Sequence, residues 1–372
     1  VRLTRDSVEI FADGQPVRRE AHEIDASVSN ADKGGYKHYM LKEIHEQPDA
    51  ISRTLSMAVH DAALRDDFLS DGNALLADVQ QVQIIACGTS YHAGMVAKYW
   101  FEQLLRVPCQ VEIASEYRYR DPVVQDYTLL VCISQSGETA DTLAALRDVK
   151  VQTPKGLVGL ALCNVPTSSL VRETDLHLLT QAGPEIGVAS TKAFTTQLVA
   201  LMLLVLKVGH VQQRMDLAGQ AQMIQNLWHL PQVINQALRL DAQIERMSHA
   251  FVEKRHALFL GRGVQFPIAL EGALKLKEIS YIHAEGYAAG ELKHGPLALV
   301  DKDMPIVVLA AQDHLLDKLK SNMQEVQARG GELFVFADVA SGIERAERTD
   351  VIYVPAVDGV LAPIVYSVPM QL

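Results

Sequence analysis

The sequence predicts an α/β protein made of two copies of one domain, each a parallel β-sheet flanked by helices. Short apolar segments rich in β-branched residues alternate with helical stretches, which is typical of parallel βαβ units. The spacing of these segments also repeats. From Cys87 to Ser134 is 47 residues, and from Gly261 to Leu309 is 48. From Ser134 to Cys163 is 29 residues, and from Leu309 to Ala337 is 28. This agreement indicates an internal duplication.

Each half contains four predicted strands. They are Val82–Ala86, Thr128–Ile133, Leu157–Leu162 and Leu176–Leu179, and then Ala257–Leu260, Ile306–Leu309, Leu333–Phe336 and Val351–Val354. A helical connector over about 212–252 joins the halves. We expect a three-layer αβα arrangement of the flavodoxin-like type in each domain, with the first domain at 39–240 and the second at 241–372.

The first 38 residues have a different character. Val8–Phe11, the Asp13-Gly14 pair and Val17 predict a hairpin, because Asp-Gly suits a turn that needs positive φ. Residues 23–38 are polar and glycine-containing, which predicts a linker after a separate segment at 1–22. Because the chain opens at Val1 within a β-like pattern, we expect it to be part of a longer protein.

Composition excludes several classes of protein. A hydrophobic content of 48% and a charged content of 21% are those of a soluble globular protein. The net charge of -11 argues against nucleic-acid binding. The most apolar run, Leu198 to Leu206, is too short to cross a bilayer and predicts a buried helix. Four cysteines without a CxxC pair predict reduced thiols in a cytoplasmic protein.

A serine-rich turn follows the strand Thr128–Ile133 and precedes a helix: Ser134-Gln135-Ser136-Gly137-Glu138-Thr139. A strand end that leads into a helix N-terminus presents free N–H groups and the positive end of the helix dipole. With hydroxyl donors added, such a turn can hold a phosphate group without lysine. It lacks the Lys-Ser/Thr ending of a P-loop. The alternative is a helix cap in which Ser136 or Thr139 serves the helix alone.

A second hydroxyl-rich turn favours the phosphate site. Thr89 and Ser90 follow the strand Val82–Ala86, and the carboxyl ends of neighbouring parallel strands meet in one crevice. The equivalent turn of the second half, Gly261-Arg262-Gly263, is only a partial dinucleotide motif. A further segment around Ser190 either joins the site or caps the next helix.

Two later segments are rich in titratable groups. Glu271, Lys275 and Glu278 share one helix face at i, i+4 and i+7. They form either a solvated ion-pair ladder or, if buried in a cleft, a cation beside a proton-transfer base. The segment 283–296 is glycine-rich, which predicts a functional loop. Within it, His294 is a candidate acid–base group. We expect no metal site, although His283, Glu285 and His294 form a conceivable ligand set.

Together these segments resemble the isomerase half of the glucosamine-6-phosphate synthase family. The resemblance runs from about Tyr36 to the C-terminus, and the opening hairpin is similar to the end of that family's glutaminase domain. It implies two sugar-isomerase (SIS) domains and an enzyme that makes glucosamine 6-phosphate from fructose 6-phosphate and glutamine-derived ammonia, for amino sugar and UDP-N-acetylglucosamine synthesis. It implies no cofactor and a cytoplasmic homodimer with shared active sites.

The resemblance also implies roles for individual residues. Glu278 matches the base that moves a proton between C1 and C2, and Lys275 matches the cation beside it. His294 matches the ring-opening histidine, which reaches into the partner subunit's site. The phosphate-binding positions are Ser134, Gln135, Ser136 and Thr139, and the sugar-binding positions are Thr89, Ser90, Val188 and Ser190.

Two family features have no match in these 372 residues. They are the C-terminal tail lysine that forms a Schiff base with the substrate and the N-terminal cysteine nucleophile of the glutaminase. We therefore expect this stretch by itself to bind sugar phosphate but to lack the covalent step and its own ammonia source. The alternative functions are a non-catalytic sugar-phosphate-binding regulatory module on the same fold and a simple sugar-phosphate isomerase without amination.

Overall fold

The computed structural model describes residues 1–19, 32–61, 63–65, 67–69 and 72–372. Contacts divide the chain into two units, Val1–Gly35 and Tyr36–Leu372. The first unit contains a small antiparallel sheet of β1 (Arg2–Leu3), β2 (Val8–Ala12) and β3 (Gln15–Val17). Asp13 and Gly14 turn between β2 and β3 with φ angles of 50° and 77°, so the predicted hairpin is confirmed. Residues 23–31 of the predicted linker lie outside the described residues.

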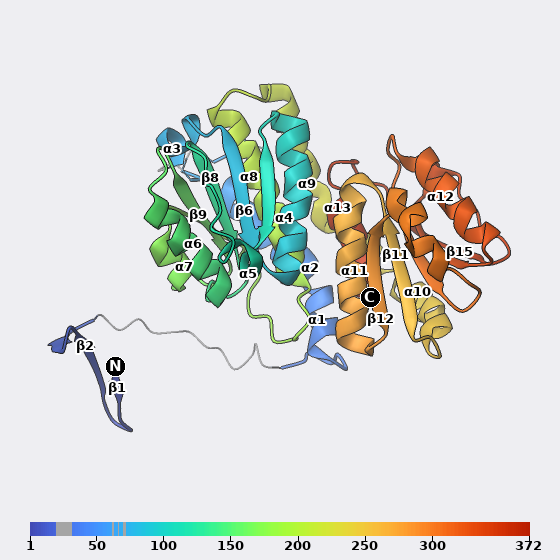
Figure 1. Cartoon of the computed structure of the whole chain (residues 1–372), viewed down its shortest axis with the longest axis horizontal. Helices are drawn as coiled ribbons and strands as arrows, with labels where there is room; N and C mark the ends of the chain where they lie inside the picture. Colours follow the sequence, from blue (N-terminus) through green and yellow to red (C-terminus); the bar gives the residue numbers. More distant parts are fainter. Residues whose placement is uncertain (20–31, 62, 66, 70–71) are drawn as a thin grey trace. The chain divides into compact units, whose positions relative to one another are not determined.

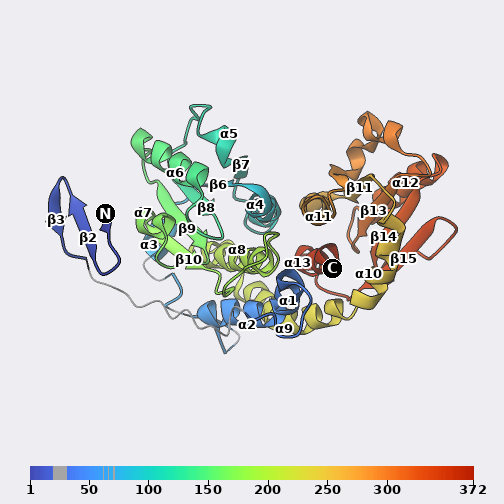
Figure 2. The ribbon, with the colours of Figure 1, turned by 90° about the horizontal axis from the view of Figure 1, so that it is seen from below.

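The second unit contains two parallel five-stranded sheets (Figures 1 and 2). In spatial order the first sheet is β10 (Leu176–Leu179), β9 (Val158–Cys163), β8 (Thr128–Ile133), β6 (Gln81–Ala86) and β7 (Cys109–Ile113). The second is β12 (His283–Ala288), β11 (His256–Gly261), β13 (Pro305–Ala310), β14 (Glu332–Asp338) and β15 (Thr349–Val354). Numbered along the chain, both have the order 2-1-3-4-5, which is the flavodoxin-like order. The duplication and the fold class are confirmed.

Helices cover both faces of the first sheet. They are α4 (Gly88–Trp100), the π-helical η3 (Phe101–Leu105), α5 (Ala114–Tyr117), α6 (Ala140–Gln152), α7 (Ser169–Glu173) and α8 (Lys192–Val211). Along β8, Leu129 and Val131 join the core on the α4 and α8 side, whereas Leu130 and Cys132 join the core beneath α5, α6 and α7. This alternation shows the three-layer arrangement, because successive strand side chains point to opposite faces.

The helix α8 is the buried helix predicted around Leu198–Leu206. Among the described residues it is the one helix long and apolar enough to cross a membrane, with a mean hydropathy of 1.7. However, 89% of its most apolar window is buried inside the protein. Its apolar character is therefore explained by core packing between the first sheet and the helices α2 (Gln47–Ala58) and α4.

The remaining helices are α1 (Tyr39–His45), α3 (Asn73–Ala77), α9 (Leu217–Leu238), α10 (Asp241–Ser248), α11 (Phe266–Ser280), α12 (Leu316–Ala328) and α13 (Ala362–Gln371). Of these, α10, α11, α12 and α13 pack against the second sheet. Short 3₁₀ turns are η4 (His249–Phe251), η5 (Gly263–Gln265), η6 (Ala289–His294), η7 (Pro296–Leu299) and η8 (Val339–Ser341), and β4 (Val59–His60) pairs with β5 (Ala63–Leu64). One apolar core runs from the first sheet into the second. The boundary between 39–240 and 241–372 stays a prediction.

Two strands of the five-stranded sheets are absent from the sequence prediction. Cys109–Ile113 was not identified, and His283–Ala288 was predicted to be part of a loop but forms β12. Each is an edge strand beside the first strand of its sheet, and each is only partly buried. An edge strand needs less apolar surface than a central one, so neither segment shows a continuous apolar run.

Candidate functional site

The serine loop, residues 134–139, lies between β8 and α6. Ser134 is buried, and its hydroxyl accepts a hydrogen bond of 3.1 Å from the Gly137 N–H and lies 2.8 Å from the Thr139 hydroxyl. The Ser136 hydroxyl accepts from the Glu138 N–H at 3.2 Å. Gly137 has a φ of +66°, and a Cβ there would come within 2.2 Å of Ser168 Oγ. The loop is therefore closely packed and depends on glycine at this position.

The serine loop does not serve only as a helix cap. Thr139 is the N-cap residue of α6, yet its side chain makes no capping hydrogen bond. Its hydroxyl is instead next to that of Ser134. The Thr139 side chain therefore does not occupy the first N–H groups of α6. These groups form the positive end of a 13-residue helix, and that end faces the serine loop. This geometry suits an anion and differs from the capping-box alternative.

The turn with Thr89 and Ser90 lies at the same edge of the sheet. It opens α4 directly after β6, and β6 pairs in parallel with β8. The Ser90 hydroxyl accepts a hydrogen bond of 3.0 Å from Gln197 in α8. The Thr89 hydroxyl donates to Glu271 at 3.0 Å, so the first domain reaches α11 of the second. Both predicted turns therefore lie at the carboxyl ends of neighbouring strands.

The row on α11 is not a solvated ladder. Glu271 and Lys275 have side chains only 1% and 3% exposed, whereas Glu278 is 35% exposed. The Lys275 ammonium lies 2.6 Å from Glu278 Oε2 and 3.3 Å from Glu271 Oε1, and it donates to the Thr89 hydroxyl at 3.3 Å. The cover comes from α4, which packs against α11 between the two sheets (Figure 2). The solvated alternative is therefore wrong for Glu271 and Lys275.

The sequence prediction missed one residue of this network. His92 Nδ1 lies 2.7 Å from Glu271 Oε2, and the histidine side chain is only 13% exposed. Burial alone would raise the pKa of the Glu271 carboxyl, but the bond to His92, the nearby charges and the Thr89 hydroxyl together hold this pKa below its usual value. The available signal was the spacing from Thr89 to His92, one turn apart on α4.

The segment around Ser190 is held by two carboxylates, the half-buried Glu185 and the buried Glu43. Glu185 accepts hydrogen bonds from the Ser190 hydroxyl at 3.0 Å and from the N–H groups of Thr191 and Ala193 at 2.9 and 3.1 Å. Burial raises the pKa of Glu185 despite these donors. Glu43 of α1 accepts from the N–H groups that precede Val188. Glu185 thus caps α8, while the Val188 side chain is 100% exposed at the tip of the segment.

His294 is not part of this network within one chain. It ends η6, is exposed, and makes no hydrogen bond or ion pair with any residue that the structure describes. Its neighbour Lys293 pairs with Glu325 of α12 at 2.9 Å. On β12, His283 lies 3.4 Å from Glu285. Across the described ranges, no group of three or more His, Cys, Asp or Glu side chains could hold a metal ion.

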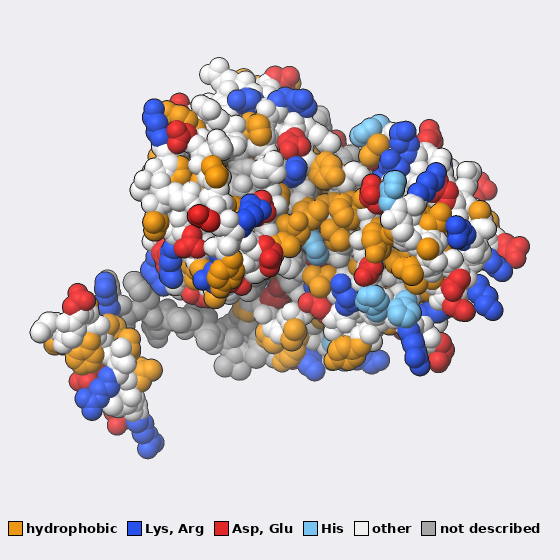
Figure 3. Space-filling model, viewed as in Figure 1, with side chains coloured by type: hydrophobic (Ala, Val, Ile, Leu, Met, Phe, Trp, Pro, Cys, Tyr) orange, Lys and Arg blue, Asp and Glu red, His pale blue; other side chains and the backbone are white. Residues whose placement is uncertain are grey.

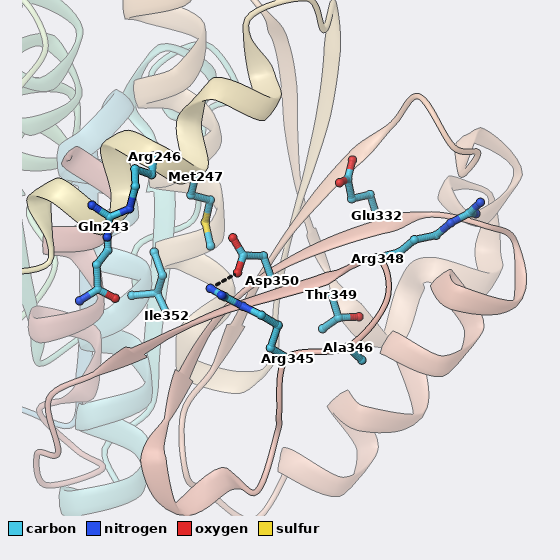
Figure 4. A pocket seen from close by; sticks show the side chains of 10 residues that line it. All are labelled: Gln243, Arg246, Met247, Glu332, Arg345, Ala346, Arg348, Thr349, Asp350 and Ile352. Atoms are coloured by element: carbon cyan, nitrogen blue, oxygen red, sulfur yellow. Dashed lines mark ion pairs between the residues drawn. The ribbon is translucent and has the colours of Figure 1, made fainter.

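The pockets that the described residues line include two that lie away from the serine loop. An apolar one of about 540 Å³ lies beneath α10, α11 and α13 and has Lys275 and Gln371 in its wall. Another, of about 470 Å³, lies beside the edge strand β15 (Figure 4). There Arg345 is paired with Asp350, and Arg348 donates to a backbone carbonyl and points away from Arg345. The second pocket contains none of the predicted site residues.

Comparison with known proteins places this arrangement in a family. The family model described as the SIS domain matches residues 75–207 and 250–372. The glutamine–fructose-6-phosphate aminotransferase (isomerizing) of Acinetobacter baylyi is 66% identical over 374 residues, covering 100% of this chain and 61% of that protein. The protein of the same name from Pseudomonas syringae is 59% identical over 373 residues, covering 100% of this chain and 61% of that protein.

A solved structure agrees with these matches. The C-terminal domain of glucosamine-fructose-6-phosphate aminotransferase from Francisella tularensis superposes with a TM-score of 0.89 and is 52% identical. The match covers 91% of this chain and 95% of that one. The chain spans about three fifths of the length of the curated relatives.

Proposed function

Because the chain belongs to the SIS domain family, we propose that it is the isomerase part of an enzyme that converts fructose 6-phosphate and glutamine-derived ammonia into glucosamine 6-phosphate. The observation that carries this proposal is the buried Glu271–Lys275–Glu278 network beside two hydroxyl-rich turns. A binding module needs a phosphate cradle, but it has no need for a buried cation paired with a half-exposed carboxylate. The names of the relatives support the same substrate class.

In this proposal the first domain holds the substrate. The phosphate lies against the serine loop, where it meets the hydroxyls of Ser134, Ser136 and Thr139, the Gln135 side chain and the N-terminus of α6. Thr89, Ser90, Val188 and Ser190 position the sugar. Of these, Val188 can contact a ligand with its whole side chain, because that side chain is fully exposed.

The second domain supplies the chemistry. Glu278 takes a proton from C1 or C2 of the open-chain sugar and returns it to the other carbon, which is general base and then general acid catalysis. The Lys275 ammonium is held between Glu271 and Glu278, and its charge stabilises the oxyanion that develops during proton transfer. Glu278 remains the more accessible of the three, as a group that must touch substrate requires.

We also propose a homodimer in which His294 of one subunit opens the sugar ring in the site of the other. Its exposure, and the absence of a partner for it among the residues that the structure describes, support this role. Hydrophobic side chains gather on the surface over α4 and α11 (Figure 3), and at the end of α11 Ile279 and Tyr281 are 57% and 92% exposed. Such surface is compatible with a subunit interface. A cytoplasmic enzyme with its own glutaminase domain, acting in amino sugar synthesis, completes the proposal.

The test is proton exchange in the full-length protein. Glu278→Gln should lower the incorporation of solvent deuterium at C1 and C2 of a hexose 6-phosphate by at least about 100-fold, because general base catalysis typically contributes that much. Binding of the hexose phosphate should stay intact. Glu245→Gln, at an exposed glutamate of α10, is the matched control and should leave exchange unchanged. Unchanged exchange in Glu278→Gln would refute the base, and absent exchange in the wild type would favour the regulatory module.

A further inference from the structure

His92 is a buried titratable residue with no task in the reaction described above. It lies on α4, one turn after Thr89, and contacts Glu271 across the boundary between the two domains. A carboxylate only accepts hydrogen bonds, so the Nδ1 atom of His92 must carry the proton and donate it to Glu271 Oε2. The other carboxylate oxygen, Oε1, accepts from the Thr89 hydroxyl and lies 3.3 Å from the Lys275 ammonium.

Among the described residues, few charged or hydrogen-bonding side chains face Glu271. From α4 the facing groups are Thr89 and His92, and from α11 itself they are Lys275 and, beyond it, Glu278. The helix α13 packs on another side and brings Tyr366, whose hydroxyl donates to a carbonyl of β13. Titratable groups of β11 and β12 pair among themselves, and these are His256, His283, Glu285 and Tyr287.

We propose that His92 is a positioning residue for the proton transfer: by donating to Glu271 Oε2, it keeps this carboxylate ionised and fixed, so that Oε1 holds the Lys275 ammonium beside Glu278. This inference rests on the proposed function, because it gives a task in that reaction to a residue which does not touch the substrate. It explains why a largely buried histidine of α4 contacts one oxygen of Glu271 while Thr89 of the same helix contacts the other.

The physical reason is the cost of a buried carboxylate. Glu271 is fully enclosed, and without the bond to His92 one of its oxygens would lose its donor in a site that water does not reach. Burial would then raise the pKa of Glu271, and the protonated form would release the Lys275 ammonium from its position. The loss should therefore appear first at acidic pH.

Two substitutions separate hydrogen bonding from packing. His92→Asn places an amide nitrogen the same number of bonds from the backbone as Nδ1, so it still donates but cannot become a cation. His92→Leu fills similar space without a donor. His210→Leu is the matched control, because the Nδ1 of His210 lies 3.2 Å from the neutral Gln220 side chain, away from α11.

In the full-length protein, we expect His92→Leu to lower kcat for C1–C2 proton exchange about 10- to 100-fold, the range of a hydrogen bond to a charged group. KM should change less than about threefold, and the acid limb of the kcat profile should move up by about one pH unit or more. His92→Asn and His210→Leu should keep the wild-type profile. Equal behaviour of the Leu and Asn variants, or a loss without a pH shift, would overturn the proposal.

A second readout does not depend on activity. Infrared difference titration of the folded proteins reports protonation of buried carboxyl groups, and Glu271→Gln identifies the band of this residue. The Glu271 band should titrate at higher pH in His92→Leu than in the wild type and in His92→Asn. If it titrates alike in all three, the role of His92 is refuted. If the band shifts as expected but wild-type exchange is absent, the proposed function fails while the coupling of His92 to Glu271 stands.

Discussion

Gly137→Ala is the substitution that tests most directly whether the serine loop is a built site. Gly137 has a φ of +66°, in the left-handed region, and an added Cβ would lie 2.2 Å from Ser168 Oγ and 2.5 Å from Ser168 Cβ. Ser168 is buried and caps α7 by accepting from the Val171 N–H, so it cannot simply turn away. The alanine must therefore shift the backbone of the loop or of α7.

The expected cost follows from two separate effects. A non-glycine residue in the left-handed conformation costs about 1–2 kcal/mol, and forcing an extra methyl group into a packed site costs about 1–3 kcal/mol. Together they predict that the free energy of unfolding falls by about 2–5 kcal/mol. Gly342→Ala isolates the first effect, because Gly342 has the same φ of +66° but no atom within 4 Å of its Cβ position.

The assay is urea unfolding of Gly137→Ala, Gly342→Ala, Ser168→Gly and the double variant Gly137→Ala/Ser168→Gly. The urea concentrations at half-unfolding are compared for variants whose unfolding free energy has the same dependence on urea concentration. The coupling energy between positions 137 and 168 is then calculated from the double-mutant cycle. Gly137→Ala should also weaken hexose 6-phosphate binding, since the Gly137 N–H donates to the Ser134 hydroxyl. If Gly137→Ala is no more destabilising than Gly342→Ala, or if Ser168→Gly restores nothing, the close packing of the loop is refuted.

Two further predictions address ligand and assembly. Ser134→Ala/Ser136→Ala should weaken binding of a hexose 6-phosphate far more than binding of the unphosphorylated hexose, measured by calorimetry, because only the phosphate uses the serine loop; an equal effect on both ligands would contradict the phosphate role. Mixing His294→Ala subunits with Glu278→Gln subunits should restore partial activity, because each mixed dimer has one site with both wild-type groups. No recovery in a mixture shown to contain mixed dimers would argue against shared sites.

The central part of the fold could be predicted because it follows from burial on both faces of each sheet. Strands such as Thr128–Ile133 are buried along their whole length, and such runs are visible in any sequence. The edge strands Cys109–Ile113 and His283–Ala288 were missed because one side of each faces solvent and its residues are mixed in character. Edge strands are defined by their partners in the sheet, which local sequence does not show.

The candidate site likewise has one part that local sequence predicts and another that depends on contacts between distant residues. The serine loop is local, so a strand, a glycine and a helix start were enough to predict its shape. The row on α11 has the same spacing whether it is solvated or buried, and only the packing of α4 decides between the two. That contact joins Thr89 to Glu271 across 182 residues of sequence. His92 escaped notice for the same reason, since its partner lies 179 residues away.

The two copies of the domain carry different residues at equivalent turns. At the turn after the first strand of its sheet, the first copy has Thr89 and Ser90, whereas the second has Arg262, which donates to Asn322 of α12 at 2.9 Å. After the third strand, the second copy continues with Ala311, Gln312 and Asp313 in place of the serine loop. The second sheet therefore lacks the hydroxyls that would cradle a phosphate.

What the second copy offers instead is α11, the helix that follows its first strand. In the first copy the equivalent helix is α4, and these two helices contact each other through Thr89, His92, Glu271 and Lys275. The duplication thus places two equivalent helices face to face, one bearing the hydroxyl turn and the other the buried carboxylate and ammonium. In the proposed reaction, a proton-transfer base on α11 can then meet a substrate whose phosphate is bound by the other domain, which neither copy could achieve alone.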